Sequence, residues 1–406
     1  MHHKKGKATL SPSSRPYIAA SVPVLREHGL AITRHFYADM FRAHPELTTL
    51  FNMGNQANGA QQQSLAAAVF AYAANIDNAA ALAPVIERIV HKHAAVGIGP
   101  AHYPVVGRHL LGAIAAVLGD AATPGLLAAW DEAYWLLAGE LIAAEARLYQ
   151  RTGTQAGELI AVRVAEVREE SEDVRSYLLQ TADGNSPGGF QPGQYISVEV
   201  GADGWRQRRQ YSLSDAPSAP WWRISVKRES AEPKGRVSNW LHTNVKPGDS
   251  LQVSPAFGDF TVQLEGETPL VLLSAGIGVT PMISALNTLL ATGSRRPVLF
   301  VHAARNGSRH ALRADLERAR AHHTDLRVIV AYECAQDSDR IGRDFQIAGR
   351  VEMQRILEAR DRDGDFYLCG PLGFMQAQWQ SLLTEKISPA RMRREVFGPE
   401  LLDHLR

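Results

Sequence analysis

The chain has 406 residues, more than one hydrophobic core usually serves, so two or three domains are expected. A composition of 45% hydrophobic and 21% charged residues is typical of a globular protein, and a formal net charge of +1 excludes a strongly basic footprint for nucleic acid. Its two cysteines, Cys334 and Cys369, cannot form a disulfide framework and belong to no Cys-x-x-Cys pattern. A reducing, cytoplasmic location is therefore expected.

The N-terminus carries Lys4, Lys5 and Lys7 but no apolar segment after them, so residues 1–12 are predicted to form a disordered tail. No window approaches the roughly 18 to 20 uncharged apolar residues of a membrane span. We therefore expect no integral membrane association.

Residues 13–152 form the first predicted domain, which is rich in Ala and Leu at helical spacing. A predicted helix over 84–96 places His93 on an apolar face with Ile86 and Val90, whereas His91 lies two residues off that face. A lone histidine in this position is more often a core residue than a ligand.

Two further predicted helices in this domain carry inward polar groups. Gln61 begins an apolar face that includes Leu65, and Tyr37 shares a face with Phe41. Buried polar groups need partners. A metal-bound ligand opposite His93 would supply one.

Residues 156–265 change to short β-branched runs between turn residues, which predict a small antiparallel barrel with strands over 160–164, 195–200 and 223–227. Within it, positions 209–212 read Arg-Gln-Tyr-Ser, where an arginine can neutralise a diphosphate and a tyrosine can pack on an aromatic ring. An ordinary exposed strand is the alternative. Positions 235–238, Gly-Arg-Val-Ser, could hold the same diphosphate or be a simple turn.

Residues 266–406 alternate strands with helices, beginning with a buried strand over 269–274, and this predicts a parallel sheet with crossover helices. The sequence Gly-Ile-Gly-Val-Thr-Pro at 276–281 follows that strand, where glycines admit a dinucleotide pyrophosphate at a helix N-terminus. A tight strand-to-helix connection is the alternative. Three basic residues after a strand over 298–301 either meet a nucleotide 2′-phosphate or only solvate a helix start: Arg305, Arg309 and Arg313.

These motifs, with Cys-Gly-Pro at 369–371 and Phe-Gly-Pro at 397–399, resemble the ferredoxin–NADP reductase superfamily over nearly all of 156–406. The resemblance implies a barrel that binds FAD and a following domain that binds NADH or NADPH. The FAD residues it implies are Tyr195, Arg209, Gln210, Tyr211, Ser212, Gly235, Val237, Ser238 and Phe397. The nucleotide residues it implies are Gly276, Gly278, Val279, Thr280, Pro281, Cys369, Gly370 and Pro371. Val279 departs from the usual glutamine of the family.

The helical domain resembles a globin, with Pro45 and Phe51 in a connection between helices, and the two halves in this order resemble the flavohaemoglobin family. The resemblance implies that His93 is the axial ligand of one non-covalent haem b, with Tyr103 and Glu145 behind it. A helix-end tyrosine and a solvated glutamate are the alternatives for that pair. It further implies a ligand pocket of Tyr37, Gln61, Leu65 and Phe51, and an electron-transfer pair of Lys92 and Glu395.

The fold class expected from this resemblance is an all-α globin, then an antiparallel β-barrel, then an α/β domain with a parallel sheet. The implied activity is that of a nitric oxide dioxygenase, in which NAD(P)H reduces FAD, FAD reduces the haem iron, and nitric oxide and O₂ become nitrate. Two alternatives stay open: an oxygen- or nitric-oxide-binding globin with a haem-maintaining reductase, and a general flavin reductase. A monomer is expected.

Overall fold

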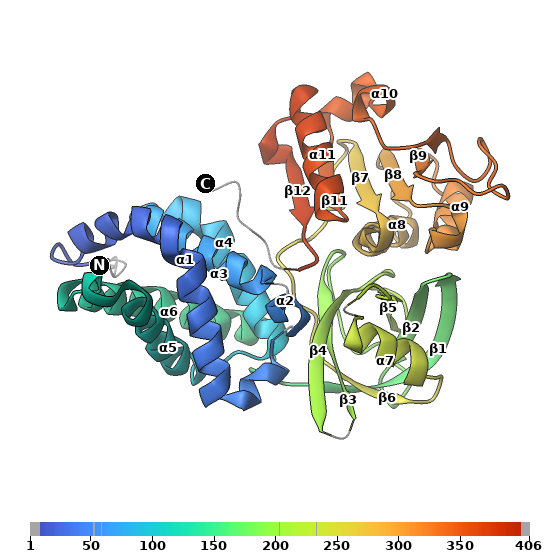
Figure 1. Ribbon diagram of the computed structural model, residues 1–406. Helices are drawn as coiled ribbons and strands as arrows, with labels where there is room; N and C mark the ends of the chain where they lie inside the picture. The colour runs from blue at the N-terminus through green and yellow to red at the C-terminus, as the bar shows by residue number, and fades with distance from the viewer. Residues whose placement is uncertain (1–8, 52, 58, 203, 233, 399–406) are drawn as a thin grey trace, which may run out of the picture. The chain divides into compact units, whose positions relative to one another are not determined.

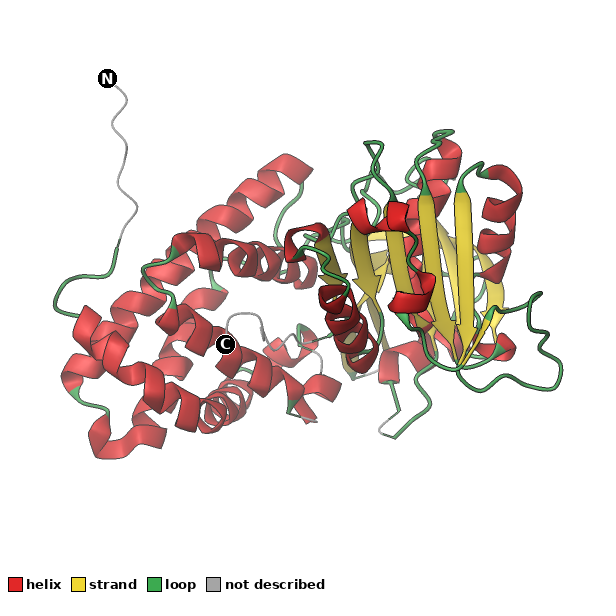
Figure 2. Cartoon of the chain, turned by 90° about the horizontal axis from the view of Figure 1, so that it is seen from above, coloured by secondary structure: helices red, strands yellow, loops and turns green. Residues whose placement is uncertain are grey.

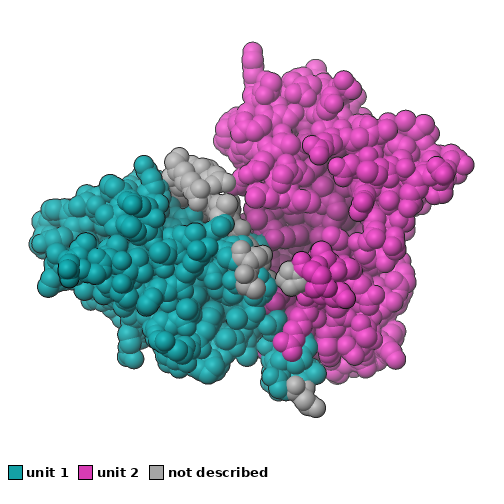
Figure 3. Space-filling model, in the orientation of Figure 1, with its two compact units in different colours: residues 1–158, 201–208, 398–406 teal, residues 159–200, 209–397 magenta. Residues whose placement is uncertain are grey.

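The computed structural model describes residues 9–51, 53–57, 59–202, 204–232 and 234–398, and the side chains of 55 and 57 are also outside the description. Contacts divide the chain into two compact units, shown in Figure 3. The first comprises 1–158, 201–208 and 398–406, and the second comprises 159–200 and 209–397. One part of the chain contains helices without strands, and the other combines strands with further helices (Figure 2).

The helical unit follows a globin-like order of elements (Figure 1). Its elements are α1 (Arg15–Ala43), η1 (Pro45–Thr49), α2 (Met53–Ala57), α3 (Ala60–Ala74), α4 (Ala79–Val96), α5 (His102–Leu118), η2 (Gly119–Ala121) and α6 (Pro124–Thr152).

Local sequence explains where the helices that carry the site begin and end. Asn78 caps α4, accepting from the Ala81 amide at 3.2 Å, and Gly97 ends that helix with φ of 87°. Thr123 caps α6 in the same way, and Gly153 ends it with φ of 67°. These capping residues define where α4 and α6 begin and end.

The core of this unit is apolar and lies between α1, α5 and α6, with Ile32, Met40, Ile114 and Trp130 among its buried residues. It extends further toward the N-terminus than expected. Leu10 is buried, and the Ser11 hydroxyl donates to Glu132 at 2.8 Å. The prediction of a disordered tail over 1–12 is therefore wrong for residues 9–12. Leu10 packs in the core, and the hydroxyls of Ser11 and Ser14 both donate to Glu132 of α6. Residues 1–8 lie outside the described ones.

One helical stretch among the described residues, His102–Ala121, is long and apolar enough to cross a membrane by length and composition. It comprises α5 and η2, and its Leu110 and Ile114 are buried in the helical core. The expectation that no window approaches a span therefore does not hold on hydropathy alone, although the stretch carries Arg108 and Asp120.

The second unit begins with an antiparallel six-stranded sheet in the order β4-β3-β6-β1-β2-β5. Its elements are β1 (Ile160–Ser171), β2 (Val174–Gln180), β3 (Tyr195–Ala202), β4 (Trp205–Ser212), β5 (Trp222–Lys227), α7 (Arg236–Asn244) and β6 (Ser250–Val253). A bridge between Leu213, just after β4, and Ile224 of β5 joins the two edges of the sheet, as in a barrel.

A parallel six-stranded sheet follows in the order β10-β9-β8-β7-β11-β12. Its strands are β7 (Leu270–Ala275), β8 (Val298–Ala304), β9 (Leu326–Tyr332), β10 (Ile347–Ala348), β11 (Asp365–Cys369) and β12 (Met392–Glu395). Its helices are η3 (Gly276–Gly278), α8 (Val279–Ala291), η4 (Gly307–Arg309), α9 (Arg313–His322), α10 (Met353–Ile356), η5 (Ala359–Asp363), α11 (Leu372–Thr384) and η6 (Pro389–Arg391). One core packs α8 and α9 against the sheet, and another packs α10 and α11. The expected fold class is confirmed.

A buried ion pair joins the two sheets of this unit. Arg223 of β5 and Asp315 of α9 are both nearly inaccessible, and the guanidinium meets the carboxylate through two bonds of 3.1 and 3.2 Å. Asn287 of α8 donates to both Asp315 and Asp215. The barrel and the α/β part therefore form one body.

Candidate functional site

His93 of α4 belongs to a hydrogen-bonded triad with Tyr103 of α5 and Glu145 of α6. Its Nδ1 lies 2.8 Å from Glu145 Oε1 and 3.2 Å from the Tyr103 hydroxyl, which itself donates to Glu145 Oε1 at 2.5 Å. Because a carboxylate only accepts hydrogen bonds, Nδ1 carries the proton and Nε2 keeps its lone pair. An imidazole fixed in this tautomer is suited to bind a metal through Nε2.

The members of this triad differ in burial. Glu145 is 2% exposed, whereas the His93 side chain is 32% exposed. Burial, followed by the hydrogen bond and charge of Glu145, raises the pKa of Tyr103 above its usual range. The alternative of a solvated glutamate is therefore wrong, and Tyr103 stays a neutral donor.

The sequence argument for His93 needs correction. His91 is the more buried histidine of α4, together with Val85 and Val90, while Ile89 and His93 are only partly buried. Ile86 and Val90 of the predicted face are buried, but His93 lies at the edge of that face and not within it. The residue that the structure connects to Glu145 and Tyr103 is nevertheless His93.

Tyr37 of α1 lies in a cluster of aromatic rings. Phe36, Phe41 and Phe51 contact it with ring centroids at 4.8, 5.7 and 5.8 Å. Burial raises the pKa of Tyr37 to about 12, while hydrogen bonds with the Gln61 and Gln56 side chains lower it in part. The phenol is therefore neutral at physiological pH and available as a donor.

The expected pocket residues come together around this tyrosine. Gln61 hydrogen-bonds it, Phe51 packs on it, and Leu65 contacts the same core cluster. Gln56 was not expected to take part. No role was assigned to it from the sequence.

The proposed electron-transfer residues lie in different units. Lys92 Nζ donates to the Gly398 carbonyl at 3.1 Å within the helical unit. Glu395 is buried in β12. Burial of the Cys369 thiol raises its pKa, and the negative charge of Glu395 raises it further.

The expected FAD residues lie along β4 and at the start of α7. Burial lowers the pKa of Arg209, which means that its charge is poorly solvated, and burial raises the pKa of Tyr211. Ser212 is buried and Gln210 is exposed at the end of the same strand. A poorly solvated guanidinium beside a tyrosine suits an anionic aromatic cofactor.

The glycine turn before α7 is closely packed. A Cβ at Gly235 would lie 2.7 Å from Ser238 Oγ and 2.8 Å from Glu229 Cβ. Val237 and Ser238 are buried in the first turn of α7, and Ser238 Oγ donates to the Gly235 carbonyl. The backbone here therefore offers a helix N-terminus that a phosphate could approach.

Two further expected FAD residues differ in exposure. Tyr195 of β3 is buried, and it forms a bridge with Phe257. Phe397 is 46% exposed at the end of the second unit.

The expected nucleotide motifs meet at the carboxyl ends of β7 and β11, which are neighbouring strands. The chain leaves β7 toward β8, β9 and β10 and returns to β11 on the other side, so this is the topological switch point of the sheet. A Cβ at Gly278 would lie 2.4 Å from the Cys369 carbonyl oxygen. Gly276 has φ of 53° and is only partly buried.

The rest of this motif is fixed by burial. Val279, Thr280 and Pro281 are buried at the start of α8, and Thr280 Oγ1 donates to the Ile277 carbonyl at 3.0 Å. On the other side, Gly370 is partly buried and Pro371 is exposed before α11. The two motifs therefore lie side by side at the carboxyl ends of β7 and β11.

The three expected basic residues are not equivalent. Arg309 pairs with Asp173 at 2.7 Å and Glu172 at 3.0 Å, both at the β1–β2 turn. Arg313 pairs with Asp344 and Glu317. Arg305 is exposed and has no described side-chain partner, so it alone keeps its charge for a phosphate.

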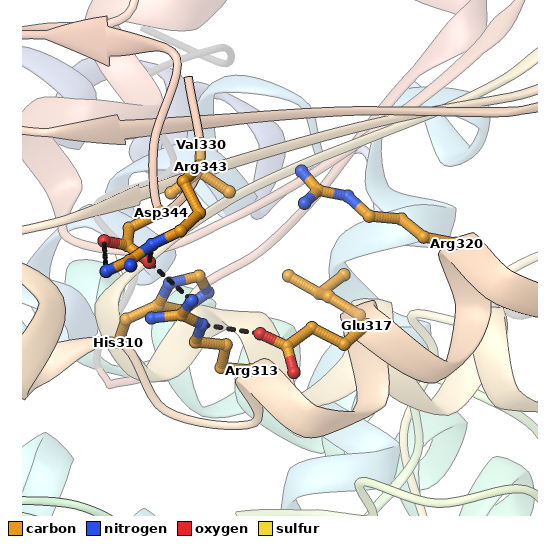
Figure 4. Close-up of a pocket in the computed structure, with 8 residues that line it drawn as sticks. His310, Arg313, Glu317, Arg320, Val330, Arg343 and Asp344 are labelled. Carbon is orange, nitrogen blue, oxygen red and sulfur yellow. Dashed lines mark hydrogen bonds and ion pairs between the residues drawn. The ribbon is translucent and has the colours of Figure 1, made fainter. Parts of the chain in front are cut away.

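A small hollow beside α9 contains Arg313, Arg320 and Arg343 with the buried His310 (Figure 4). The Arg313 guanidinium lies between the carboxylates of Glu317 and Asp344, so its charge is already neutralised. Because β9 is separated from β7 by β8, this hollow does not lie at the Gly276–Pro281 motif that follows β7.

Together the fold and these clusters define a globin joined to a two-domain oxidoreductase module. The family model described as Globin matches residues 34–141. The model of the Oxidoreductase FAD-binding domain matches 161–262, and that of the Oxidoreductase NAD-binding domain matches 272–380.

Whole-chain relatives narrow this class to one family. A flavohemoprotein of Rhizobium meliloti is 44% identical over 97% of this chain and 99% of its own. The crystal structure of a flavohemoglobin from Malassezia yamatoensis with bound FAD and heme is 32% identical with a TM-score of 0.85, covering 96% of this chain and 100% of that one. The FAD/NAD-binding domain of a nitric oxide dioxygenase from Vibrio cholerae is 38% identical with a TM-score of 0.54, covering 59% of this chain and 99% of that one. The chain belongs to the flavohemoprotein family.

Proposed function

We propose that this protein is a nitric oxide dioxygenase that uses NAD(P)H and O₂ to convert nitric oxide to nitrate. The observation that carries the proposal is the His93–Glu145–Tyr103 triad, which presents Nε2 as a metal ligand. A carboxylate on Nδ1 makes the imidazole a stronger donor, which favours oxygen chemistry over storage. Two relatives support the same reading, one with bound FAD and heme and one named a nitric oxide dioxygenase.

The residues present fit the three cofactors. The donor set of His93 suits haem b, the Arg209 charge with the Gly235 turn suits the FAD diphosphate, and the Gly278 contact with Cys369 suits a dinucleotide. Bound together, these groups supply hydride transfer, the conversion of an electron pair to single electrons, and oxygen chemistry at iron.

The chain's own residues supply orientation and polarity. Glu145 and Tyr103 hold the proton on Nδ1 of His93 and so fix the ring. Tyr37 offers a neutral hydroxyl to a diatomic ligand, with Gln61 beside it and Leu65 shaping the pocket. Lys92 and Glu395 are assigned to electron transfer between flavin and haem. The two cysteines are free, which is compatible with a cytoplasmic location. We expect the protein to act as a monomer.

The test is a His93→Ala variant of the full chain. We expect it to lose the normal haem spectrum and NADH-dependent nitric oxide consumption while keeping FAD and NADH-driven reduction of ferricyanide. An unchanged five-coordinate ferrous spectrum would remove His93 as the ligand. Nitric oxide consumption that survives complete haem removal would instead favour a general flavin reductase.

Slow turnover of the unmodified protein under saturating NADH, O₂ and nitric oxide would contradict the dioxygenase proposal in a different way. It would favour a binding globin whose reductase only maintains ferrous haem.

A further inference from the structure

The last turn of α4, which follows His93, is held by an arginine of a strand. Arg208 of β4 donates from Nη1 to the Val96 carbonyl at 3.0 Å, and both residues belong to the helical unit. Val96 ends α4, so its carbonyl is one of the four that have no partner within the helix. A cation at the C-terminal end of a helix is also favoured by the helix dipole. Arg208 therefore caps the helix that carries the proposed haem ligand.

The turn that follows α4 packs closely against its neighbours. A Cβ at Gly97 would lie 2.8 Å from Gly157 Cα and 2.9 Å from Arg208 Nη1. The Tyr149 hydroxyl of α6 also donates to the Ile98 carbonyl at 3.1 Å. Three segments therefore fix this turn: β4, α6 and the stretch between α6 and β1.

This turn is hydrogen-bonded to His93 itself. The amides of Gly97 and Ile98 donate to the His93 carbonyl at 3.0 and 2.9 Å. Two hydrogen bonds and one peptide group therefore connect Arg208 to the backbone of His93. The ring is held separately, because its Nδ1 lies 2.8 Å from Glu145 Oε1. A displaced backbone would therefore tilt the ring about Nδ1 and change the direction of the Nε2 lone pair.

We infer that Arg208 is a positioning residue for His93: by holding the last turn of α4, it sets the direction in which Nε2 meets the haem iron. Groups behind a metal-binding histidine orient its ring and tune the metal. The contact with Val96 is one hydrogen bond from Nη1, so it needs a donor of sufficient reach and not a bidentate fork. Arg208 also directly precedes Arg209, the first residue of the expected FAD motif. One strand therefore carries both the contact with α4 and the residues expected to bind FAD.

The inference rests on the proposed function, since it needs haem bound through His93. Its test uses the full-length ferrous protein without added ligand, in which resonance Raman spectroscopy records the stretching band of the iron–Nε2 bond. Arg208→Met removes the donor and keeps an unbranched side chain. We expect the band to move to lower frequency and to broaden, because the ring tilts and takes several orientations. Exchange of the Gly97 and Ile98 amides with deuterium should become about two- to tenfold faster, as for the loss of one hydrogen bond.

Further variants at this strand make the result specific. Arg208→Lys keeps a long cationic donor and should return the band toward its wild-type position. Arg206→Met changes an exposed arginine of the same strand and should leave the band and the exchange rates unchanged. If Arg208→Met does not retain haem, Arg208→Gln, which keeps a neutral donor of shorter reach, takes its place.

A detached ligand separates positioning through the helix from the charge of the arginine. In His93→Gly with added imidazole, the metal ligand is no longer joined to α4, so Arg208→Met should leave the iron–imidazole band where it is. An equal shift for the joined and the detached ligand would overturn the inference, because it would show an effect of charge through space.

The inference is also overturned if Arg208→Met keeps the wild-type band, whatever its exchange rates. In that case the proposed function stands, provided that the wild type shows the iron–histidine band and consumes nitric oxide. A wild type without that band removes His93 as the ligand and the proposed function with it.

Discussion

A single hydroxyl distinguishes Tyr37 from the phenylalanines around it, which makes it a clean site for substitution. Tyr37→Phe keeps the ring packing and removes one donor. We expect O₂ dissociation from the ferrous protein to be about tenfold faster or more, as for a hydrogen bond to a charged group. Flash photolysis with stopped-flow measures the rate.

Reduction of ferricyanide by NADH should be unchanged in the same variant, because it needs only the reductase half. An O₂ dissociation rate equal to that of the wild type would show that Tyr37 does not reach the ligand.

At the residue scale, the sequence named three residues that lie together in the structure, but it did not predict their surroundings. His93, Tyr103 and Glu145 were named from the family resemblance, and the structure brings all three within hydrogen-bond distance. Burial was not predictable: Glu145 reads as a solvated charge on α6, and only its contacts from two other helices make it a buried acceptor. Gln56 was missed for the same reason, since its partners come from α1 and α3.

We predict that coenzyme choice depends on Arg305, which is exposed. Arg309 and Arg313 are held by carboxylates, whereas Arg305 at the end of β8 is not. We expect NADH to be used well, with some use of NADPH through Arg305. Arg305→Glu should lower kcat/KM for NADPH relative to NADH, measured by FAD reduction with each nucleotide. A ratio that stays the same would remove Arg305 from the nucleotide site.

At the scale of elements, η3 packs so closely against the end of β11 that no side chain fits at Gly278. In Gly278→Ala the new methyl group would meet the Cys369 carbonyl, so η3 must move away from β11. We expect a loss of about 1–3 kcal/mol in stability and a higher KM for NADH, with FAD still bound. Thermal unfolding and steady-state kinetics measure the two effects.

Gly373→Ala is the matched control, because nothing lies within 4 Å of a Cβ at that position of α11. Its stability and its KM for NADH should stay at or near the wild-type values. A Gly278→Ala variant that matches this control would mean that this position of η3 tolerates a side chain.

Element prediction succeeded where the pattern was local. The strands β7 and β8 of the parallel sheet were placed within a few residues, because continuous apolar runs such as 270–275 are buried on both faces. The strands β10 and β12 of the same sheet were not predicted. The strands β2 and β6 were not predicted. β6 has four residues, and β2 contains Arg175 and Ser176, whose partners His242 and Ser225 come from elsewhere in the barrel.

At the scale of the whole molecule, electrons must pass from one unit to the other. Lys92 directly precedes the proposed haem ligand, and Glu395 lies two residues before Phe397. Lys92→Glu should slow flavin-to-haem electron transfer without changing hydride transfer from NADH to FAD. Glu395→Lys in the same chain should partly restore the rate. Stopped-flow absorbance, read separately at flavin and haem bands, gives both rates.

Equal haem reduction rates in the wild type and Lys92→Glu would exclude a role for this residue in the transfer. A slower flavin reduction in Lys92→Glu would point instead to damage in the reductase half.

The buried pair of Arg223 and Asp315 has a consequence for how the protein melts. Unfolding the barrel or the α/β part alone would break this buried pair, and removing one partner of a buried pair typically costs about 3–5 kcal/mol. Partial unfolding of either part alone is therefore disfavoured, and calorimetry should record one endotherm for the second unit, residues 159–200 and 209–397. A ligand that binds only the barrel then protects the distant strands β8 and β9 from hydrogen exchange as well, because both parts share a single opening event.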